Sequence, residues 1–470
     1  MQQYPGIIVY CQTIQDVSNA VIWAQKNCMP LRIRSGGHNY EGYSNGNCAL
    51  VIDISEMNDI EIEEEQGLVH VLAGVTNKQV YDYVSSRGYP FPGGTCPTVG
   101  VSGYSLGGGW GLSCRYLGLG CDSVEEIHLI DADGRLISAS RTNNEDLFWA
   151  CRGAGGGNFG VVVSITFRLP PKVESVTLIE IEYLHVTSQK QLEFWEMWQS
   201  WLNQADYRMT LISRVYHSVQ DGLAMLVRGI FYGTSQEAEQ QLQAFLQADP
   251  TKSNLEETTF LQAVQILGSG YPAWEMFSAA SRFVMCDLTP AEIFSLIQMV
   301  QNPPEGSVFT GFSLYALGGK VAEVGQDDTA FYYRKAKYIL WMSTVWEDPI
   351  YVNPGRAWIN THFPLFASMT EGAYVNFPYR YLPHWLCEYF GCHTERLQAI
   401  KQKYDPCGVF SFPQGLRVSE HFETVWCAGP EWDTYHSAAR QSGMNYRGFR
   451  YVGEEPDWQT TESQEDPPSV

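Results

Sequence analysis

Two side chains that could act as nucleophiles, His38 and Cys96, lie in glycine-rich turns of the sequence. His38 follows two consecutive glycines in the segment RIRSGGHNYEGYS, residues 32–44. Adjacent glycines let backbone N–H groups approach an anion closely, as they do in phosphate-binding nests. A Gly-Gly turn is more commonly a simple chain reversal, and a histidine after it is commonly a polar loop residue. The motif alone therefore leaves both interpretations open.

Cys96 lies in a longer loop, FPGGTCPTVGVSGYSLGGGWG, which spans residues 91–111 and contains eight glycines. Glycine at this density, beside Pro92 and Pro97, is incompatible with a helix or a central strand. We therefore expect a loop whose backbone lies against a ligand. The segment differs from the dinucleotide fingerprint, which needs GxGxxG between a parallel strand and a helix. It also differs from a P-loop, because no GK[ST] follows.

A third glycine-rich segment, RGAGGGNFGVVVSITFRL, occupies residues 152–169 and leads directly into a predicted strand that begins at Val161. In isolation, this pattern would indicate a hairpin or a bulge. Three such loops within one region of about 170 residues indicate instead an extended cofactor that is held largely by the main chain.

The elements around these loops are short β-branched runs that alternate with helical segments, and they predict a compact α+β nucleotide-binding domain. After Pro170-Pro171 the strands lengthen and amphipathic helices separate them, which predicts an antiparallel sheet covered by helices on one face. Trp195, Trp198 and Trp201 recur at helical spacing, so we expect them to pack in the core. The expected strands are 9–10, 31–34, 50–54, 68–73, 164–167, 176–183 and 223–232, and the expected helices are 13–26, 77–87, 188–204 and 236–247.

The glycine-rich motifs together resemble one known family. RSGGH, the cysteine of GGTCPTVGVSG 58 positions after His38, GGGWG and GGGNFGVVV are similar to the berberine bridge enzyme-like branch of the vanillyl-alcohol oxidase superfamily. The resemblance implies an α+β fold with a PCMH-type FAD-binding domain of two α+β subdomains and a substrate domain. It also implies FAD bound by two covalent bonds, from His38 to the flavin 8α-methyl carbon and from Cys96 to C6. Imidazole and thiolate are suitable nucleophiles for an electron-poor ring.

The resemblance also divides the chain. It implies an FAD-binding domain at 1–169, a substrate domain at 170–366 and a C-terminal segment at 367–416 that returns to the FAD domain. Residues 417–470 form a tail whose acidic, weakly apolar end we expect to be disordered. Family members usually carry a further helix and strand before the position of Tyr4. This chain is therefore expected to be either a fragment or a sequence whose start is assigned late.

Further cofactor contacts follow from the same resemblance. The turn from Ser35 to Asn39 would bind the pyrophosphate through backbone amides, and Asn376 would reach the cofactor from the C-terminal segment. Val99 occupies a position where oxygen-using members tend to have a small residue, which favours an oxidase over a dehydrogenase. The implied cofactor-binding set is Arg34, Ser35, Gly36, Gly37, His38, Asn39, Cys96, Pro97, Thr98, Val99, Gly100, Gly103, Tyr104, Gly107, Gly108, Phe159, Gly160, Val161, Val162 and Asn376.

The catalytic base is where the sequence departs from the family. The usual C-terminal motif resembles YVNYPD, whereas this chain has YVNFPY at residues 374–379, so that Phe377 replaces the tyrosine. A phenylalanine cannot accept a proton. Tyr374 and Tyr379 remain as candidate catalytic phenols, and alternation along a strand would place Tyr374 beside Asn376. A phenol with a pKa of about 10 needs a cation to lower that pKa or a carboxylate to take its proton. A packing role for Tyr374 therefore remains an equal alternative.

Composition limits the possible partners. The formal charge of −22, from 30 Lys+Arg against 52 Asp+Glu, predicts no binding to nucleic acid or anionic lipid. No apolar stretch is long enough to cross a bilayer, and the first ten residues lack the features of a signal peptide. The default expectation is a cytoplasmic protein, although secretion is left open because the N-terminus is short. The cysteine and histidine spacings predict no metal site, and the oligomeric state is not determined.

Three functions are compatible with the sequence. The first is an FAD-dependent oxidase that transfers hydride from an alcohol to flavin N5 and reduces O2 to H2O2, with a carbohydrate anomeric hydroxyl as the preferred substrate. The second is oxidation or oxidative cyclisation of an alkaloid or another secondary metabolite. The third is a flavin-binding scaffold without redox turnover, which the loss of the family tyrosine at Phe377 would explain.

Overall fold

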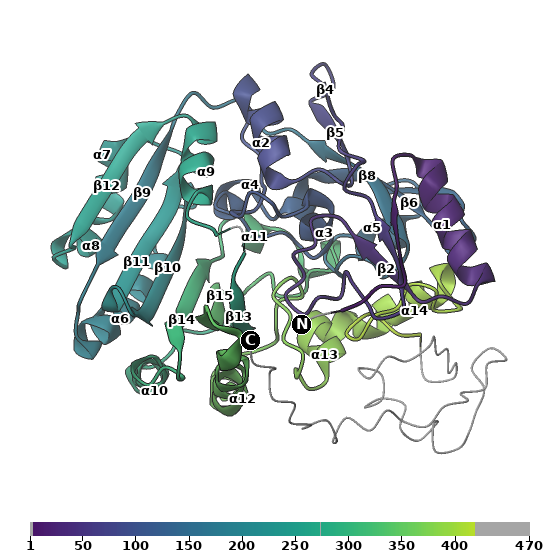
Figure 1. Ribbon diagram of the computed structural model, residues 1–470. Coiled ribbons are helices and arrows are strands. Elements are labelled where there is room, and N and C mark those ends of the chain that lie inside the picture. Colours follow the sequence, from purple (N-terminus) through teal and green to yellow (C-terminus); the bar gives the residue numbers. More distant parts are fainter. Residues whose placement is uncertain (1–2, 273, 419–470) are drawn as a thin grey trace, which may run out of the picture.

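The computed structural model describes residues 3–272 and 274–418, and the predicted acidic tail therefore lies almost entirely outside the described residues. The described strands form three sheets, with a seven-stranded sheet on one side of the molecule and two smaller sheets on the other (Figure 1). The predicted α+β class is confirmed, as is an antiparallel sheet in the second half of the chain.

The smallest sheet has the order β1-β3-β2 and is parallel throughout. Its strands are β1 (Ile7–Tyr10), β2 (Leu31–Arg34) and β3 (Leu50–Asp53), and helix α1 (Ile14–Lys26) connects the first two. The helix begins after Thr13 because Thr13 and Asp16 form a reciprocal capping box. Since β2 ends at Arg34, its carboxyl end delivers the RSGGH turn.

The second sheet is antiparallel, with the order β4-β5-β8-β6-β7. Its strands are β4 (Ile60–Glu63), β5 (Leu68–Leu72), β6 (Val124–Ile130), β7 (Leu136–Ser140) and β8 (Val161–Arg168). The glycine-rich loop that contains Cys96 lies in the connection between β5 and β6. That connection holds α2 (Asn77–Val84), η1 (Ser85–Arg87), α3 (Val101–Leu106), α4 (Cys114–Leu117) and η2 (Gly120–Ser123), and α5 (Glu145–Ala150) follows β7.

The seven-stranded sheet is antiparallel, with the order β12-β9-β11-β10-β14-β15-β13 (Figure 1). Its strands are β9 (Val176–Tyr183), β10 (Met209–Ser218), β11 (Gly222–Phe231), β12 (Lys252–Thr258), β13 (Met276–Val284), β14 (Ser307–Ala316) and β15 (Tyr338–Trp346). Long helices α6 (Ser188–Leu202), α10 (Pro290–Gln301) and α12 (Val352–Ser368) pack against it. The shorter helices are α7 (Ser235–Gln241), α8 (Gln243–Gln247), α9 (Phe260–Gly268), α11 (Lys320–Glu323), η3 (Gln326–Asp328) and η4 (Pro349–Tyr351).

Strand alternation gives this sheet two different faces. Trp195 of α6 contacts Phe312 of β14, with ring centroids 5.7 Å apart, and Trp198 contacts Tyr338 of β15 at 4.8 Å. Both tryptophans are fully buried, as expected from their helical spacing. Trp341, three positions after Tyr338 on β15, points to the opposite face, because successive side chains of a strand alternate. This second face is turned toward the two small sheets.

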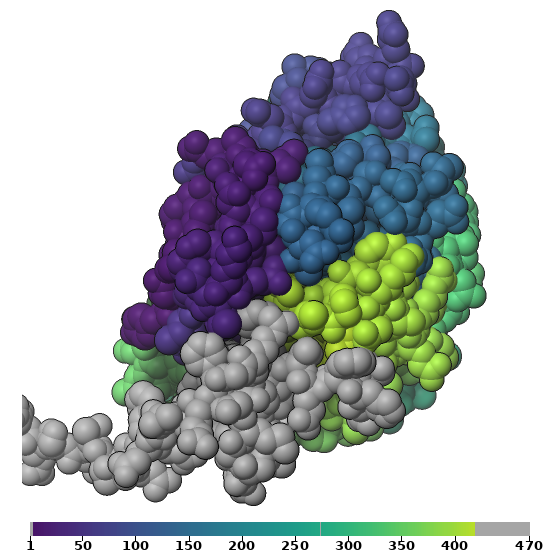
Figure 2. Space-filling model, turned by 90° about the vertical axis from the view of Figure 1, so that its right-hand side faces the viewer, coloured from purple at the N-terminus to yellow at the C-terminus, as the bar shows by residue number. Residues whose placement is uncertain are grey.

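The C-terminal segment comprises α13 (Trp385–Phe390), η5 (Gly391–His393) and α14 (Thr394–Tyr404). Figure 2 shows this segment, in yellow, against the blue surface formed by residues near 150. Tyr404 donates a hydrogen bond to Asp146 at 2.8 Å, and Lys403 pairs with the same carboxylate at 2.7 Å. The last part of the described chain therefore packs on α5, beside the two small sheets.

Residues 374–378 do not form the strand whose alternation would place Tyr374 beside Asn376. The N–H of Phe377 donates to the carbonyl of Tyr374 at 2.9 Å, so these residues form a turn. The hydroxyl of Ser281 on β13 causes this local structure: it accepts from the N–H of Tyr374 at 3.1 Å and donates to the carbonyl of Phe377 at 3.0 Å. These bonds take the place of the backbone pairing that a strand would require.

No described helix is long and apolar enough to cross a bilayer. No group of three or more His, Cys, Asp or Glu among residues 3–272 and 274–418 is arranged to hold a metal ion.

Candidate active site

A cavity of about 710 Å³ separates the two small sheets from the free face of the seven-stranded sheet. Its walls come from the RSGGH turn, the Cys96 loop, the third glycine-rich loop, strands β10, β13, β14 and β15, and two stretches of the C-terminal segment. All three sequence motifs therefore meet around one space. The predicted site residues that line it are Ser35, Gly36, Gly37, His38, Asn39, Cys96, Val99, Gly100, Gly103, Tyr104, Gly160, Val162, Tyr374 and Asn376.

The remaining predicted residues do not line the cavity. Two of them, Arg34 and Gly107, contact other residues of the fold instead. Arg34 pairs with Asp53 at 2.5 Å, at the carboxyl ends of β2 and β3. A Cβ on Gly107 would lie 2.0 Å from the amide oxygen of Asn376, so this glycine admits the asparagine rather than a ligand. The predicted residues absent from the lining are Arg34, Pro97, Thr98, Gly107, Gly108, Phe159, Val161 and Tyr379.

His38 and Cys96 come together at a shared partner. The Nε2 atom of His38 lies 2.8 Å from the hydroxyl oxygen of Thr98, and the Sγ atom of Cys96 lies 3.5 Å from the same oxygen. Both side chains also line the cavity. Burial lowers the pKa of the His38 imidazole, which keeps the ring neutral at neutral pH and leaves a nitrogen lone pair available. Two nucleophiles from separate loops are thus presented to the same space.

Two glycines near these residues have different roles. Gly36 lets the two loops touch, and Gly103 leaves open space for a cofactor. A Cβ on Gly36 would lie 2.5 Å from the backbone nitrogen of Gly100, so the two turns touch through their main chains. A Cβ on Gly103 would meet no atom within 4 Å, so this glycine faces open space in the cavity. A flat ring system can therefore approach the main chain at Gly103, which is the fit that a flavin requires.

The hydroxyl of Tyr374 is held by three donors. It accepts from the N–H of Gly109 at 2.9 Å, from the N–H of Trp110 at 3.1 Å and from the amide nitrogen of Asn376 at 3.0 Å. Asn376 also donates to the carbonyl of Tyr104 at 2.9 Å. Tyr374 thus joins the C-terminal turn to the GGGWG segment, and burial raises the pKa of its phenol to about 12 despite these hydrogen bonds.

Tyr379 occupies a different environment. Its hydroxyl donates to the side-chain oxygen of Asn360 on α12 at 2.8 Å, and the residue does not line the cavity. Burial raises the pKa of this phenol as well. Tyr374 is therefore the only one of the two predicted catalytic tyrosines that reaches the cavity, and it keeps its proton at neutral pH.

We expect Tyr374→Phe to weaken the fold and to leave the pH profile of turnover unchanged. The variant leaves the N–H groups of Gly109 and Trp110 without their buried acceptor, which costs about 1–3 kcal/mol. Thermal melting of the holoprotein measures this loss, and Tyr379→Phe, which removes one hydrogen bond to Asn360, is the matched control. Disappearance of one limb of the pH–rate profile in Tyr374→Phe alone would instead identify this phenol as the base.

Four aromatic rings that were not among the predicted site residues form part of the cavity wall. Tyr40 stacks on Phe377 with centroids 5.5 Å apart and planes 13° apart, and Phe277 meets Tyr40 edge-on at 5.0 Å. Trp341 lies 6.0 Å from both Tyr40 and Phe377. Phe377, which replaces the family tyrosine, therefore completes an apolar cluster. Adjacency to His38 could have indicated Tyr40, but nothing local in the sequence singles out Phe277 or Trp341.

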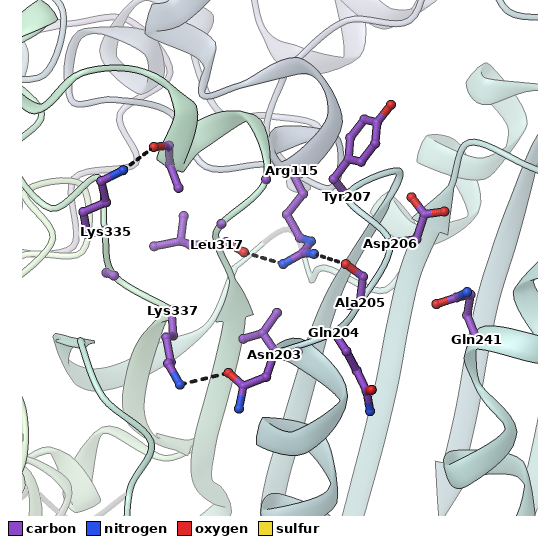
Figure 3. Close-up of a pocket in the computed structure, with 15 residues that line it drawn as sticks. Arg115, Asn203, Gln204, Ala205, Asp206, Tyr207, Gln241, Leu317, Lys335 and Lys337 are labelled. Atoms are coloured by element: carbon purple, nitrogen blue, oxygen red, sulfur yellow. Dashed lines mark hydrogen bonds between the residues drawn. The ribbon is translucent and has the colours of Figure 1, made fainter.

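A second cavity, of about 620 Å³, lies at the end of β14, where α4 meets the loop after α6 (Figure 3). Its lining contains none of the predicted site residues. Arg115 donates to the carbonyls of Leu317 at 2.6 Å and Ala205 at 2.9 Å, while Lys335 and Lys337 also donate to protein acceptors (Figure 3). These cations join parts of the fold, so we place the active site in the larger cavity.

Comparisons with known proteins identify the family of the chain. The sequence matches the family model described as an FAD binding domain over residues 5–140 and the one described as berberine and berberine like over residues 373–417. The FAD-linked oxidoreductase YgaK of Bacillus subtilis is 35% identical over 422 residues, which are 88% of this chain and 92% of that protein. The chain belongs to the berberine bridge enzyme-like FAD-linked oxidoreductases. The two matched regions contain His38, Cys96, Tyr374 and Asn376.

Other berberine bridge enzyme-like proteins resemble the chain over a similar length. Monolignol oxidoreductase AtBBE-like 13 of Arabidopsis thaliana is 28% identical over 443 residues, which are 85% of this chain and 81% of that protein. The solved structure of Physcomitrella patens BBE-like 1 has a TM-score of 0.81 at 27% identity and covers 88% of this chain and 92% of its own. The family that the sequence motifs indicated is confirmed, and FAD is the cofactor of this oxidoreductase.

Proposed function

We propose that the chain is an alcohol oxidase in which His38 and Cys96 both attach FAD covalently. The observation that carries the proposal is their convergence on the hydroxyl of Thr98 at the wall of the larger cavity. Bound there, FAD would supply a two-electron acceptor that takes hydride at N5 and passes the electrons to O2, giving H2O2. The free face of the seven-stranded sheet, across the cavity, would bind the substrate.

The residues of the chain prepare this site in three ways. The main chain at Gly36 and Gly100 brings the two glycine-rich turns into contact and fixes the loops that carry both nucleophiles. Tyr374 and Asn376 hold the C-terminal turn against the GGGWG segment. The cluster of Tyr40, Phe277, Trp341 and Phe377 gives the part of the cavity that faces the sheet an apolar wall, against which a substrate would lie.

Two substrate classes fit the aromatic wall. A carbohydrate with an anomeric hydroxyl is the class that we expect from the sequence, and the aromatic part of the cavity wall would lie against a sugar ring. An aromatic alcohol or another secondary metabolite is the second class. Stacked and edge-on contacts suit an aromatic ring, and a relative with 28% identity is named as a monolignol oxidoreductase.

Peroxide release from the purified holoprotein would test this function. The panel should contain mono- and oligosaccharides on one side and aromatic alcohols, phenols and amines on the other. We expect O2-dependent turnover with at least one alcohol, and the side of the panel that responds identifies the class. If no compound bleaches the flavin spectrum under anaerobic conditions, the alcohol oxidase is excluded and the flavin-binding scaffold becomes the better account.

A further inference from the structure

The free face of the seven-stranded sheet carries two arginines whose environments differ. On β11, Arg228 lies opposite Ile212 of β10, and on β10, Arg214 lies opposite Leu226 of β11, so both side chains are on the same face. Arg228 is near two carboxylates of β9: its guanidinium lies 3.4 Å from Glu180 and 3.7 Å from Glu182. The protein itself therefore neutralises the charge of Arg228.

Arg214 has no such partner. Among the described residues, no hydrogen bond and no ion pair within 4.0 Å involves its guanidinium, which lies 5.8 Å from the ring centroid of Phe309. The side chain lines the cavity, whereas Arg228 does not. A guanidinium has five N–H donors in a planar fork that matches a carboxylate. Arg214 thus presents an unused anion-binding group to the space where the substrate must lie.

The other charged residues that line the cavity, Arg32 and Glu275, are not available to bind an anion. Arg32 also lines the cavity, but its guanidinium donates to the carbonyls of Leu31, Asn45 and Ser411. Glu275 is the only carboxylate among the described lining residues. It lies beyond 4.0 Å from Arg214, yet the charge of Arg214 counteracts the rise that burial causes in the pKa of the Glu275 carboxyl. The Glu275 carboxylate repels anions in the same space, and it therefore disfavours a ligand with two negative charges.

We infer that the substrate of this oxidoreductase carries a carboxylate, which Arg214 binds through its guanidinium while the remainder of the substrate lies against the aromatic cluster. The inference rests on the proposed function, because it places the substrate in the larger cavity. It makes Arg214 a specificity-determining residue that acts at a distance from the reacting alcohol. The net charge of −22 and the nearby Glu275 favour a singly charged carboxylate over a phosphate ester.

Binding of matched acid and neutral probes to the holoprotein would test this inference without requiring turnover. One pair is 4-(hydroxymethyl)benzoate with its methyl ester, and the other is D-glucuronate with D-glucose. Perturbation of the flavin absorbance reports the Kd of each probe. We expect the acid of at least one pair to bind about tenfold or more tightly than its neutral partner, since a hydrogen-bonded charge pair contributes that much. We also expect its affinity to fall with added salt.

Three variants assign the effect to Arg214. Arg214→Gln should abolish the preference for the acid, and Arg214→Lys should retain part of it because an ammonium keeps the charge without the planar fork. Arg228→Gln, on the same face, should leave the preference intact. Arg214→Gln should also melt close to the unmutated protein, because among the described residues the guanidinium makes no hydrogen bond and no ion pair within 4.0 Å, and its ring contact with Phe309 is long, at 5.8 Å.

The binding experiment tests the role of Arg214 independently of the proposed oxidase activity. Equal binding of acid and neutral probes in both pairs, or an unchanged preference in Arg214→Gln, overturns the role of Arg214 even if a neutral alcohol is oxidised. A preference for the acid that depends on Arg214 supports the role even if no probe is oxidised, in which case only the oxidase proposal fails.

Discussion

The purified holoprotein is expected to keep its flavin after denaturation, with an intact mass increased by one FAD. His38→Ala and Cys96→Ala should each retain attached flavin, whereas the double variant should lose it completely on acid precipitation. The physical reason is the position of both side chains at Thr98: either nucleophile alone can hold the flavin at the cavity wall. Partial desolvation lowers the pKa of the His38 imidazole, which favours the neutral ring, the form that can add to an electron-poor carbon.

Intact-mass spectrometry and the visible spectrum of the denatured protein measure this effect. Cys286→Ala is the control for removal of a thiol, because Cys286 is exposed and does not line the cavity. Complete release of flavin from the unmutated chain by acid would show that neither bond exists. If only one of the two single variants loses all its flavin, the flavin is attached by one bond. That bond is then to the residue replaced in that variant.

The glycine-rich loops were predictable from the sequence because their signal is local. The density of glycine around Cys96, and the two glycines before His38, exclude regular structure wherever the chain folds. The side chains contributed by the sheet were not predictable in this way. Arg214 lies opposite Ser313, 99 positions later in the sequence, and only this register places it on the cavity face rather than beneath the helices.

Two expectations about local structure failed because of contacts between residues far apart in the sequence. Alternation suggested a strand through Tyr374, but the hydroxyl of Ser281, 93 positions earlier, holds the segment in a turn. Tyr374 and Asn376 still meet, through a side-chain hydrogen bond rather than through a shared strand face. The helix expected at 236–247 is divided at Leu242, which is buried between α7 and α8. In both cases tertiary contacts override the local pattern.

Replacement of Lys401 by methionine is expected to destabilise the protein by about 3–5 kcal/mol, because it leaves a buried carboxylate without its cation. Lys401 on α14 and Asp405 are both almost fully buried and pair at 2.7 Å. The ammonium also donates to the carbonyl of Asn158, in the third glycine-rich loop, at 2.5 Å and to that of Phe410 at 2.6 Å. This ion pair therefore fastens the C-terminal segment to a loop that lines the cavity.

Urea unfolding of the holoprotein would measure the loss, and the same helix provides a matched control. Lys403→Met removes an exposed lysine that pairs with Asp146, and such surface pairs contribute less than about 1 kcal/mol. The double variant Lys401→Met/Asp405→Asn should recover part of the stability, since it removes the unpaired charge and keeps a side-chain oxygen near the N–H groups of Val409 and Phe410, which both donate to Asp405. An equal effect of Lys401→Met and Lys403→Met would show that the buried pair does not hold the segment. In that event the hydrogen bond from the N–H of Leu416 to the side chain of Asn158, at 2.9 Å, would be the attachment to test next.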